Sequence, residues 1–71
     1  MPAIANRRWN ICDMDDNCLA QIEAESDLKA LNHFALSRGY GEYDIQDPDL
    51  QPHYINGRLH APFENFEVMV Y

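Results

Sequence analysis

Only one stretch of the chain has the periodicity of a helix, and start and stop signals bound it on both sides. Ser26 is a typical N-cap residue, and Asp27 places a negative charge at the positive end of the helix dipole. Gly39 supplies the left-handed residue that ends such a helix, so we expect it to run from Ser26 to about Arg38. Its apolar side predicts a helix that covers one face of a sheet. That side consists of Leu28, Leu31, Phe34 and Ala35.

The segment before the helix, residues 7–25, alternates between apolar and polar side chains as a β-hairpin does. Residues 13–17 (Asp-Met-Asp-Asp-Asn) separate the two strands with side chains that suit a turn. An even-length loop puts the apolar residues on one face and sets the register. The expected cross-strand pairs are Ile11 with Ala20, Trp9 with Ile22 and Arg8 with Glu23.

A strand, a hairpin and a last strand are expected after the helix. Residues 42–46 alternate, with Tyr43 and Ile45 on one face, and Asp47-Pro48-Asp49 ends this strand. Residues 53–60 form a hairpin around Asn56-Gly57, which favours a type I′ turn. The last strand, 63–71, should point Phe66, Val68 and Val70 inward. We therefore expect an α+β fold, with a single helix packed on an antiparallel sheet of about four or five strands in the order ββαβ plus a terminal hairpin and strand.

Length and composition indicate one small folded domain over residues 1–71. Hydrophobic residues make up 46% of the chain, which is too many for a disordered protein. The arginines Arg7 and Arg8 follow the short apolar N-terminal stretch instead of preceding it, so no secretory signal is predicted, and no segment reaches the length of a membrane helix. A cytoplasmic protein is expected, as a monomer or a homodimer.

Metal and thiol chemistry is only weakly indicated. Residues 13–17 begin like a calcium loop, but Cys18 stands where the loop needs glycine and Ala24 where it needs glutamate. A tight acidic turn is the preferred interpretation, with weak divalent-ion binding as the alternative. A disulfide between Cys12 and Cys18 needs an odd loop length, whereas the expected register places them on opposite sides of the hairpin. Two free thiols are therefore predicted.

Histidine and serine residues do not form a catalytic pattern. His53 and His60 should be cross-strand neighbours, which is half of a zinc site, but a polar, exposed face of the hairpin is the more common arrangement and is preferred. Ser26 is a cap, Ser37 a helix-surface residue, and no glycine-rich phosphate loop is present. We expect no enzyme, no metal and no cofactor. A deep pocket holding a histidine (His33, His53 or His60) beside a carboxylate would reopen the question.

The acidic excess is the strongest functional signal, with twelve Asp and Glu against five Lys and Arg and a net charge of -7. Glu23 and Glu25 should point outward from one strand, and Glu42 and Asp44 from another. Alternate residues on a strand are about 6.6 Å apart, which is comparable with the phosphate spacing of nucleic acids. Such a surface repels DNA and RNA and is attracted to basic clefts. The alternative is an acidic surface that only solubilises the protein.

In size, in its single helix 26–38 on an antiparallel sheet, and in these outward acids, the chain resembles the small acidic inhibitors encoded by phages, in particular anti-CRISPR proteins that mimic DNA. The resemblance implies a non-catalytic inhibitor that occupies the basic nucleic-acid-binding site of a bacterial defence effector, such as a CRISPR effector subunit. It would act in the cytoplasm of the bacterial host and would bind neither nucleic acid nor membrane directly.

The expected partner-binding residues are acids on the strands, acids at one end of the patch and two aromatic anchors. They are Glu23, Glu25, Glu42, Asp44, Asp47 and Asp49, then Asp13, Asp15 and Asp16, and finally Tyr40 and Tyr43. The alternative is a generic interaction module that binds through a sheet edge or an apolar patch. An even scatter of the acids over the surface would favour that module.

Overall fold

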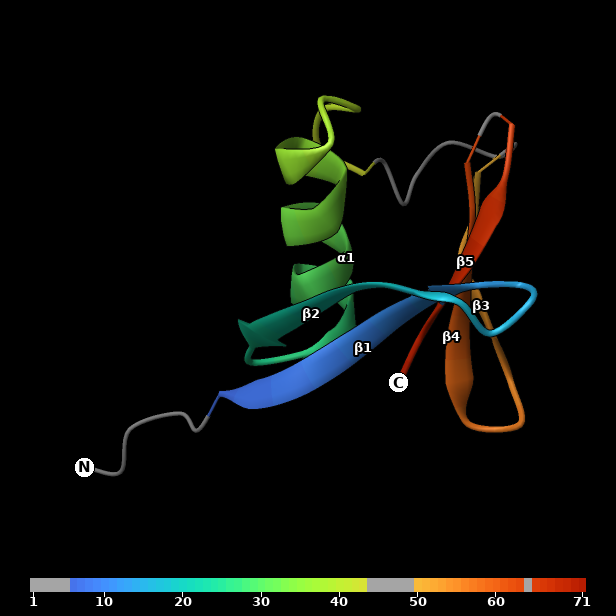
Figure 1. Ribbon diagram of the computed structural model, residues 1–71, viewed down its shortest axis with the longest axis horizontal. Coiled ribbons are helices and arrows are strands. Elements are labelled where there is room, and N and C mark those ends of the chain that lie inside the picture. The colour runs from blue at the N-terminus through green and yellow to red at the C-terminus, as the bar shows by residue number, and fades with distance from the viewer. Residues whose placement is uncertain (1–5, 44–49, 64) are drawn as a thin grey trace.

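The two hairpins expected from the sequence both form, and the last strand joins them into one sheet (Figure 1). The structure is a computed structural model that describes residues 6–43, 50–63 and 65–71. The elements are β1 (Arg7–Asp13), β2 (Cys18–Ala24), α1 (Asp27–Ser37), β3 (His53–Ile55), β4 (Arg58–Pro62) and β5 (Glu67–Val70). The strand order is β2-β1-β5-β4-β3, with all neighbours antiparallel. The α+β class, one helix on an antiparallel sheet of five strands in the described chain, is confirmed.

The first hairpin has the predicted register over most of its length. The pairs Arg8 with Glu23, Trp9 with Ile22 and Ile11 with Ala20 are confirmed. The register then shifts between Ile11 and Cys12, so that Cys12 pairs with Cys18 and Leu19 is the extra residue of a β-bulge.

The bulge corrects the expectation that the cysteines lie on opposite sides of the hairpin. The extra residue on β2 gives the remaining loop an odd length, which makes Cys12 and Cys18 direct partners. Both are free thiols, as predicted.

The second hairpin turns at Asn56 and Gly57, as expected. Their φ angles are 53° and 78°, which is the left-handed pair that a type I′ turn requires. His53 pairs with His60 and Ile55 with Arg58. The turn thus fixes which side chains of the two strands meet.

The helix begins and ends where the sequence indicates. The Ser26 hydroxyl accepts a hydrogen bond from the Lys29 backbone N–H at 3.3 Å. At the other end Gly39 has φ 80°, and the Tyr40 N–H donates to the Ala35 carbonyl at 2.9 Å. The buried side of α1 is made of Ala30, Leu31, Phe34 and Ala35.

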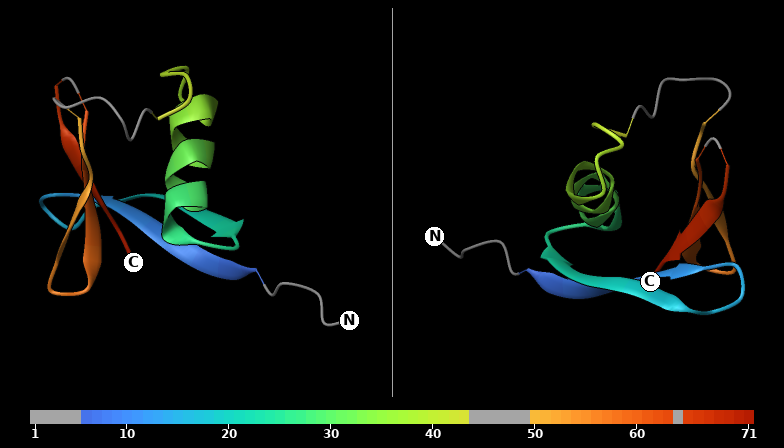
Figure 2. Two further views of the ribbon diagram at one scale, coloured as in Figure 1. Left: turned by 180° about the vertical axis from the view of Figure 1, so that it is seen from behind. Right: turned by 45° about the horizontal axis from the view of Figure 1, so that its top comes forward.

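The strands of the two hairpins run in different directions, and α1 occupies the corner between them. Figure 2 shows α1 over β1 and β2, with β3, β4 and β5 rising beside it. The core fills this corner, and Phe34, Ile11 and Leu31 are its largest fully buried side chains. Burial of each such side chain contributes about 2 kcal/mol to folding. The helix and both hairpins therefore depend on one shared core.

The chain after the helix differs from the expectation at two places. Glu42 and Tyr43 do not lie in a strand, and the rest of the strand expected at 42–46 is outside the described residues. Phe66 precedes β5 and is 37% exposed, so it does not point inward with Val68 and Val70, which are buried. Within the described ranges, no helix is long and apolar enough to cross a membrane.

Candidate protein-docking surface

Exposed aromatic rings gather where α1 ends. The helix cap turns the chain at Gly39 and places Tyr40 over two phenylalanines from the other side of the corner. The Tyr40 ring lies 5.4 Å from the Phe63 ring and 5.5 Å from the Phe66 ring, centroid to centroid. Tyr40 is 53% exposed and Phe66 37% exposed. Two large rings are thus held at the surface next to each other.

The core holds these rings in place from below. Phe63 and Phe66 stack at 4.7 Å with nearly parallel planes, and the Phe63 N–H donates to the Phe66 carbonyl at 2.7 Å. Phe63 also meets the edges of Phe34 at 6.2 Å and Tyr43 at 5.1 Å, which ties the cluster to buried side chains. Such aromatic contacts contribute roughly 0.5–1.5 kcal/mol each beyond their burial. The surface rings therefore have a defined geometry before any partner arrives.

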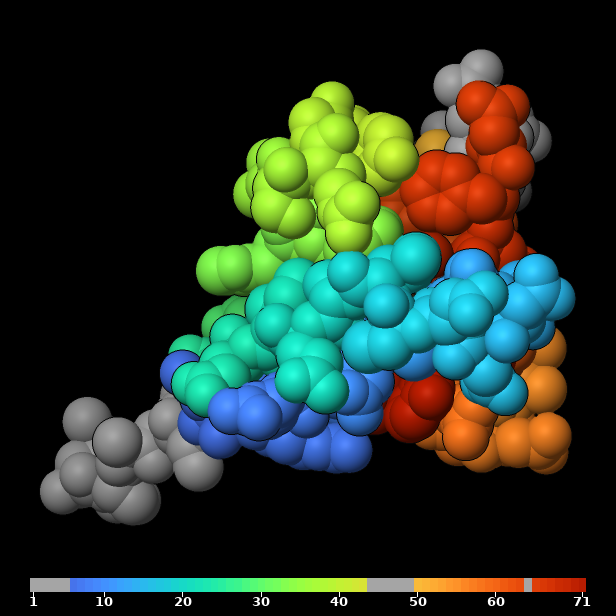
Figure 3. All heavy atoms as spheres, in the orientation of Figure 1, coloured from blue at the N-terminus to red at the C-terminus, as the bar shows by residue number. Residues whose placement is uncertain are grey.

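Two adjoining hollows flank these rings, and together we call them the aromatic groove. One holds about 210 Å³ and the other about 310 Å³, and Tyr40 and Phe66 line both. On the face in Figure 3, the yellow-green segment after α1, the teal β2 and the red start of β5 converge at this place. The first hollow is also lined by Leu50, Phe63 and Asn65, and the second by Asp13, Leu19, Phe34 and Arg38.

The bulge in β2 brings an apolar side chain to this groove. Leu19 is the unpaired bulge residue and is 36% exposed. Its carbonyl accepts a hydrogen bond from Arg38 Nη2 at 2.9 Å, and the Arg38 guanidinium also lies 5.2 Å from the centre of the Phe34 ring. Arg38 is therefore engaged by neighbouring groups of the protein itself.

Asp13 gives the groove a fixed negative charge. Its Oδ1 accepts hydrogen bonds from the backbone N–H groups of Asp15 and Asn17, each at 2.9 Å. The bond from the Asn17 backbone, together with the other donors in this turn, holds the pKa of Asp13 below its ordinary value. Asp13 is thus ionised at neutral pH.

Several of the other expected contact acids already have cationic partners. Glu23 lies 3.8 Å from Arg8, Glu25 lies 2.6 Å from Lys29, and Asp16 lies 3.7 Å from Arg58. Exposed pairs of this kind are weak, so a partner's lysine or arginine could exchange with them. They nevertheless reduce the local negative charge.

Three of the expected acids have no cationic partner in the described part of the chain. They are Asp13, at the groove, and the exposed Asp15 and Glu42. Asp44, Asp47 and Asp49 lie outside the described residues.

The segments that carry the described acids are spread out. Figure 1 places the end of β2, the turn 13–17 and the segment after α1 at three separate corners. Tyr43 differs from the expectation of an exposed anchor, because it is only 7% exposed and its hydroxyl donates to the Pro62 carbonyl at 2.7 Å. Of the two predicted anchors, the structure brings only Tyr40 to the surface.

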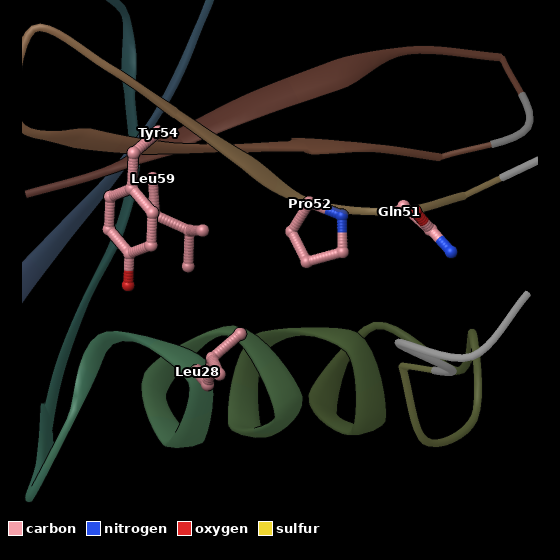
Figure 4. A pocket seen from close by; sticks show the side chains of 5 residues that line it. All are labelled: Leu28, Gln51, Pro52, Tyr54 and Leu59. Atoms are coloured by element: carbon pink, nitrogen blue, oxygen red, sulfur yellow. The ribbon is translucent and has the colours of Figure 1, made fainter. Parts of the chain in front are cut away.

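A third hollow of about 320 Å³ lies between α1 and β3. Figure 4 shows Leu28 from the helix facing Leu59 and Tyr54 across it, with Gln51 and Pro52 further along. The Tyr54 hydroxyl donates to Asp27 Oδ2 at 2.6 Å, and this hydrogen bond raises the pKa of Tyr54. No histidine lines any of these three hollows, so none pairs a histidine with a carboxylate.

The histidine pair forms, but it is not the exposed polar face that the sequence predicts. The His53 and His60 rings stack at 5.7 Å, yet His60 is only 7% exposed, because β4 lies inside the sheet. His60 Nδ1 lies 3.6 Å from Glu67 Oε2 and makes no hydrogen bond to any residue that the structure describes. Among the residues that the structure places, no group of three or more His, Cys, Asp or Glu could hold a metal ion.

The sequence interpretation missed most of the aromatic groove. The alternation of residues 7–25 predicts a regular strand at Leu19, and that of 63–71 predicts an inward-facing Phe66. The groove exists because a bulge and a turn remove both side chains from those positions. The only local signal was the pair Phe63 and Phe66, whose spacing of three does not fit a strand.

Comparison with family models, with curated proteins and with solved structures finds no match to this chain.

Proposed function

We propose that this protein is a non-catalytic binding protein that docks a basic protein partner in its aromatic groove. The observation that carries the proposal is the pair Tyr40 and Phe66, whose exposed rings are fixed by core contacts between two hollows. Aromatic side chains in such positions are the typical anchors of protein interfaces.

Charge selects the class of partner. With a net charge of -7, the protein attracts basic surfaces and repels nucleic acid. Within the groove, Asp13 is ionised and, among the residues that the structure describes, accepts hydrogen bonds only from its own turn, whereas the Arg38 charge is engaged by Leu19 and Phe34. The groove therefore suits a segment with an apolar side chain beside a lysine or arginine. The apolar side chain would enter a hollow, and the cation would approach Asp13.

The inhibitor hypothesis from the sequence is a second candidate. In it the acidic surface occupies the basic nucleic-acid-binding site of a defence effector, as an anti-CRISPR DNA mimic does. The net charge favours it, and so do Asp15 and Glu42, which have no cationic partner in the described ranges. The groove is favoured instead by the ion pairs of Glu23 with Arg8 and of Glu25 with Lys29. It is also favoured by the spread of the acid-bearing segments over three corners of the fold.

A peptide titration tests the groove. The probe is a synthetic peptide with a Leu-Trp pair flanked by lysines, and its matched control carries glutamates in place of the lysines. Amide shifts of the labelled protein should concentrate at residues 19, 40 and 66 with the basic peptide and stay unchanged with the acidic one. Equal shifts with both peptides, or shifts confined to other surfaces, would contradict the proposal.

A second titration separates the two candidates. Reversal of charge at Asp15 and Glu42 to lysine leaves the groove intact and weakens a DNA mimic. The partner in this titration is a basic nucleic-acid-binding protein. Mimicry is supported if competing DNA displaces the unaltered protein from this partner and the double variant no longer binds it. Binding that survives both, but not Tyr40→Ala, supports the groove.

A further inference from the structure

The two cysteines face each other across the first hairpin. The bulge at Leu19 makes Cys12 and Cys18 direct partners, and the next position of the ladder is closed by a hydrogen bond from the Asp13 N–H to the Asn17 carbonyl at 3.0 Å. Hydrogen-bonded and non-hydrogen-bonded pairs alternate along an antiparallel ladder, so the cysteines form a non-hydrogen-bonded pair. The Cα atoms of such a pair lie about 4.5 Å apart. Disulfides span Cα separations of about 4.4–6.8 Å.

The two thiols differ in their access to solvent. Cys18 is exposed, whereas Cys12 is 2% exposed and its Sγ lies 3.4 Å from the Tyr71 hydroxyl. A reagent in solution can therefore reach Cys18 and not Cys12. This asymmetry assigns Cys18 as the attacking thiol and Cys12 as the resolving thiol.

We propose that Cys12 and Cys18 form a redox-active dithiol that a low-molecular-weight disulfide oxidises to an intramolecular disulfide. In the first step the Cys18 thiolate attacks one sulfur of the reagent, and one thiolate leaves. In the second step the Cys12 thiolate attacks the Cys18 sulfur of this mixed disulfide and releases the second reagent thiolate. Two protein thiols are oxidised, one reagent disulfide is reduced to two thiols, and the two cysteine protons pass to them.

The surroundings of Cys18 set the pH range of the reaction. Partial desolvation and the adjacent Cys12 thiol raise the pKa of Cys18 above its ordinary value. Little thiolate is then present at neutral pH, and oxidation accelerates as the pH rises toward that pKa.

Glutathione disulfide is the probe for the test, applied to the intact folded chain. The expected product is a monomer that has lost two hydrogen atoms and no longer reacts with iodoacetamide after unfolding. Because the disulfide closes a small loop in the unfolded chain, it should raise the melting temperature of the protein by about 10 °C. A product with both thiols still reactive, or a disulfide-linked dimer, would overturn the proposal.

Single substitutions test the order of attack. In Cys12→Ser the mixed disulfide should persist on Cys18, because nothing resolves it. In Cys18→Ser, which changes an exposed side chain and preserves the core, the buried Cys12 should stay unmodified. Rapid modification of Cys12 in folded Cys18→Ser would show that the thiols react independently and would contradict the assigned roles.

Discussion

The rings of Tyr40 and Phe66 lie 5.5 Å apart, although one follows the helix and the other precedes the last strand. Both rings border both hollows of the aromatic groove. Neither ring is needed to fill the core, since Phe34 and Phe63 lie beneath them. This relationship makes the groove a surface whose aromatic residues can be altered without disturbing the fold.

Replacement of Tyr40 by alanine should weaken binding of the basic Leu-Trp peptide by about tenfold or more, because an anchor ring is lost. Ile55→Ala is the matched control, since Ile55 is 44% exposed but lies on β3, away from the groove. It should leave the affinity unchanged. Isothermal titration calorimetry measures both. An equal loss in the two variants would show that general surface hydrophobicity, and not the groove, binds the peptide.

A pair of tyrosine substitutions separates core from surface. Tyr43 is buried, and its single hydroxyl proton lies within hydrogen-bond reach of the carbonyls of Leu50 and Pro62, so Tyr43→Phe leaves a part-buried acceptor without its donor. We expect a loss of about 1–3 kcal/mol in the free energy of unfolding. Tyr54→Phe removes the hydrogen bond to Asp27 at a 60% exposed residue, where water replaces it.

The expected cost of Tyr54→Phe is about 0.5 kcal/mol. Urea denaturation monitored by circular dichroism compares the two variants. If Tyr54→Phe proved the more damaging, the assignment of Tyr43 to the core would be wrong.

The sequence predicted the fold well where a residue sets the geometry of the backbone next to it. Ser26 and Gly39 set the ends of the helix, and Asn56-Gly57 set the second hairpin, because capping and turn preferences act through neighbouring backbone groups. The pairs of the first hairpin followed from the alternation of Trp9 and Ile11. These features require no knowledge of distant contacts.

The groove could not be predicted in this way, because it depends on contacts between remote segments. The bulge at Leu19 has no sequence signal of its own, and it changes both the cysteine pairing and the face on which Leu19 lies. Likewise, the burial of Tyr43 follows from its hydrogen bonds to Asn32 and Pro62. Acids are easy to count in a sequence, but their ion pairs appear only once the strands and helix are placed.

The turn at Gly57 provides a prediction on backbone strain. Gly57 has φ 78°, and a Cβ there would meet no neighbouring atom, so any cost of substitution comes from the backbone conformation alone. Gly57→Ala should lower the free energy of unfolding by about 1–2 kcal/mol. Gly57→Asn should cost less, because asparagine tolerates the left-handed region. Thermal unfolding of both variants checks the order, and equal costs would contradict the type I′ assignment.

The acidic turn should make stability depend on pH through Asp13. Its pKa is lower in the folded protein than in the unfolded chain, chiefly because of the hydrogen bond from the Asn17 backbone. A carboxyl of this kind stabilises the fold above its unfolded pKa of about 3.9, and the contribution is lost as the pH falls through the lower folded value. Asp13→Ala should therefore be less stable than the unaltered protein at pH 7.

That difference should shrink below a pH of about 4, since the protonated carboxyl no longer accepts these bonds as strongly. Asp13→Asn is the control, because its amide oxygen can still accept from the turn but carries no charge. Its stability gap to Asp13→Ala should stay constant with pH. Urea denaturation at pH 7 and pH 3 measures all three proteins, and the other acids cancel in the comparison. The difference in free energy of unfolding between the unaltered protein and Asp13→Ala could instead be the same at both pH values. The Asp13 charge would then not stabilise the turn, which forms the acidic edge of the groove.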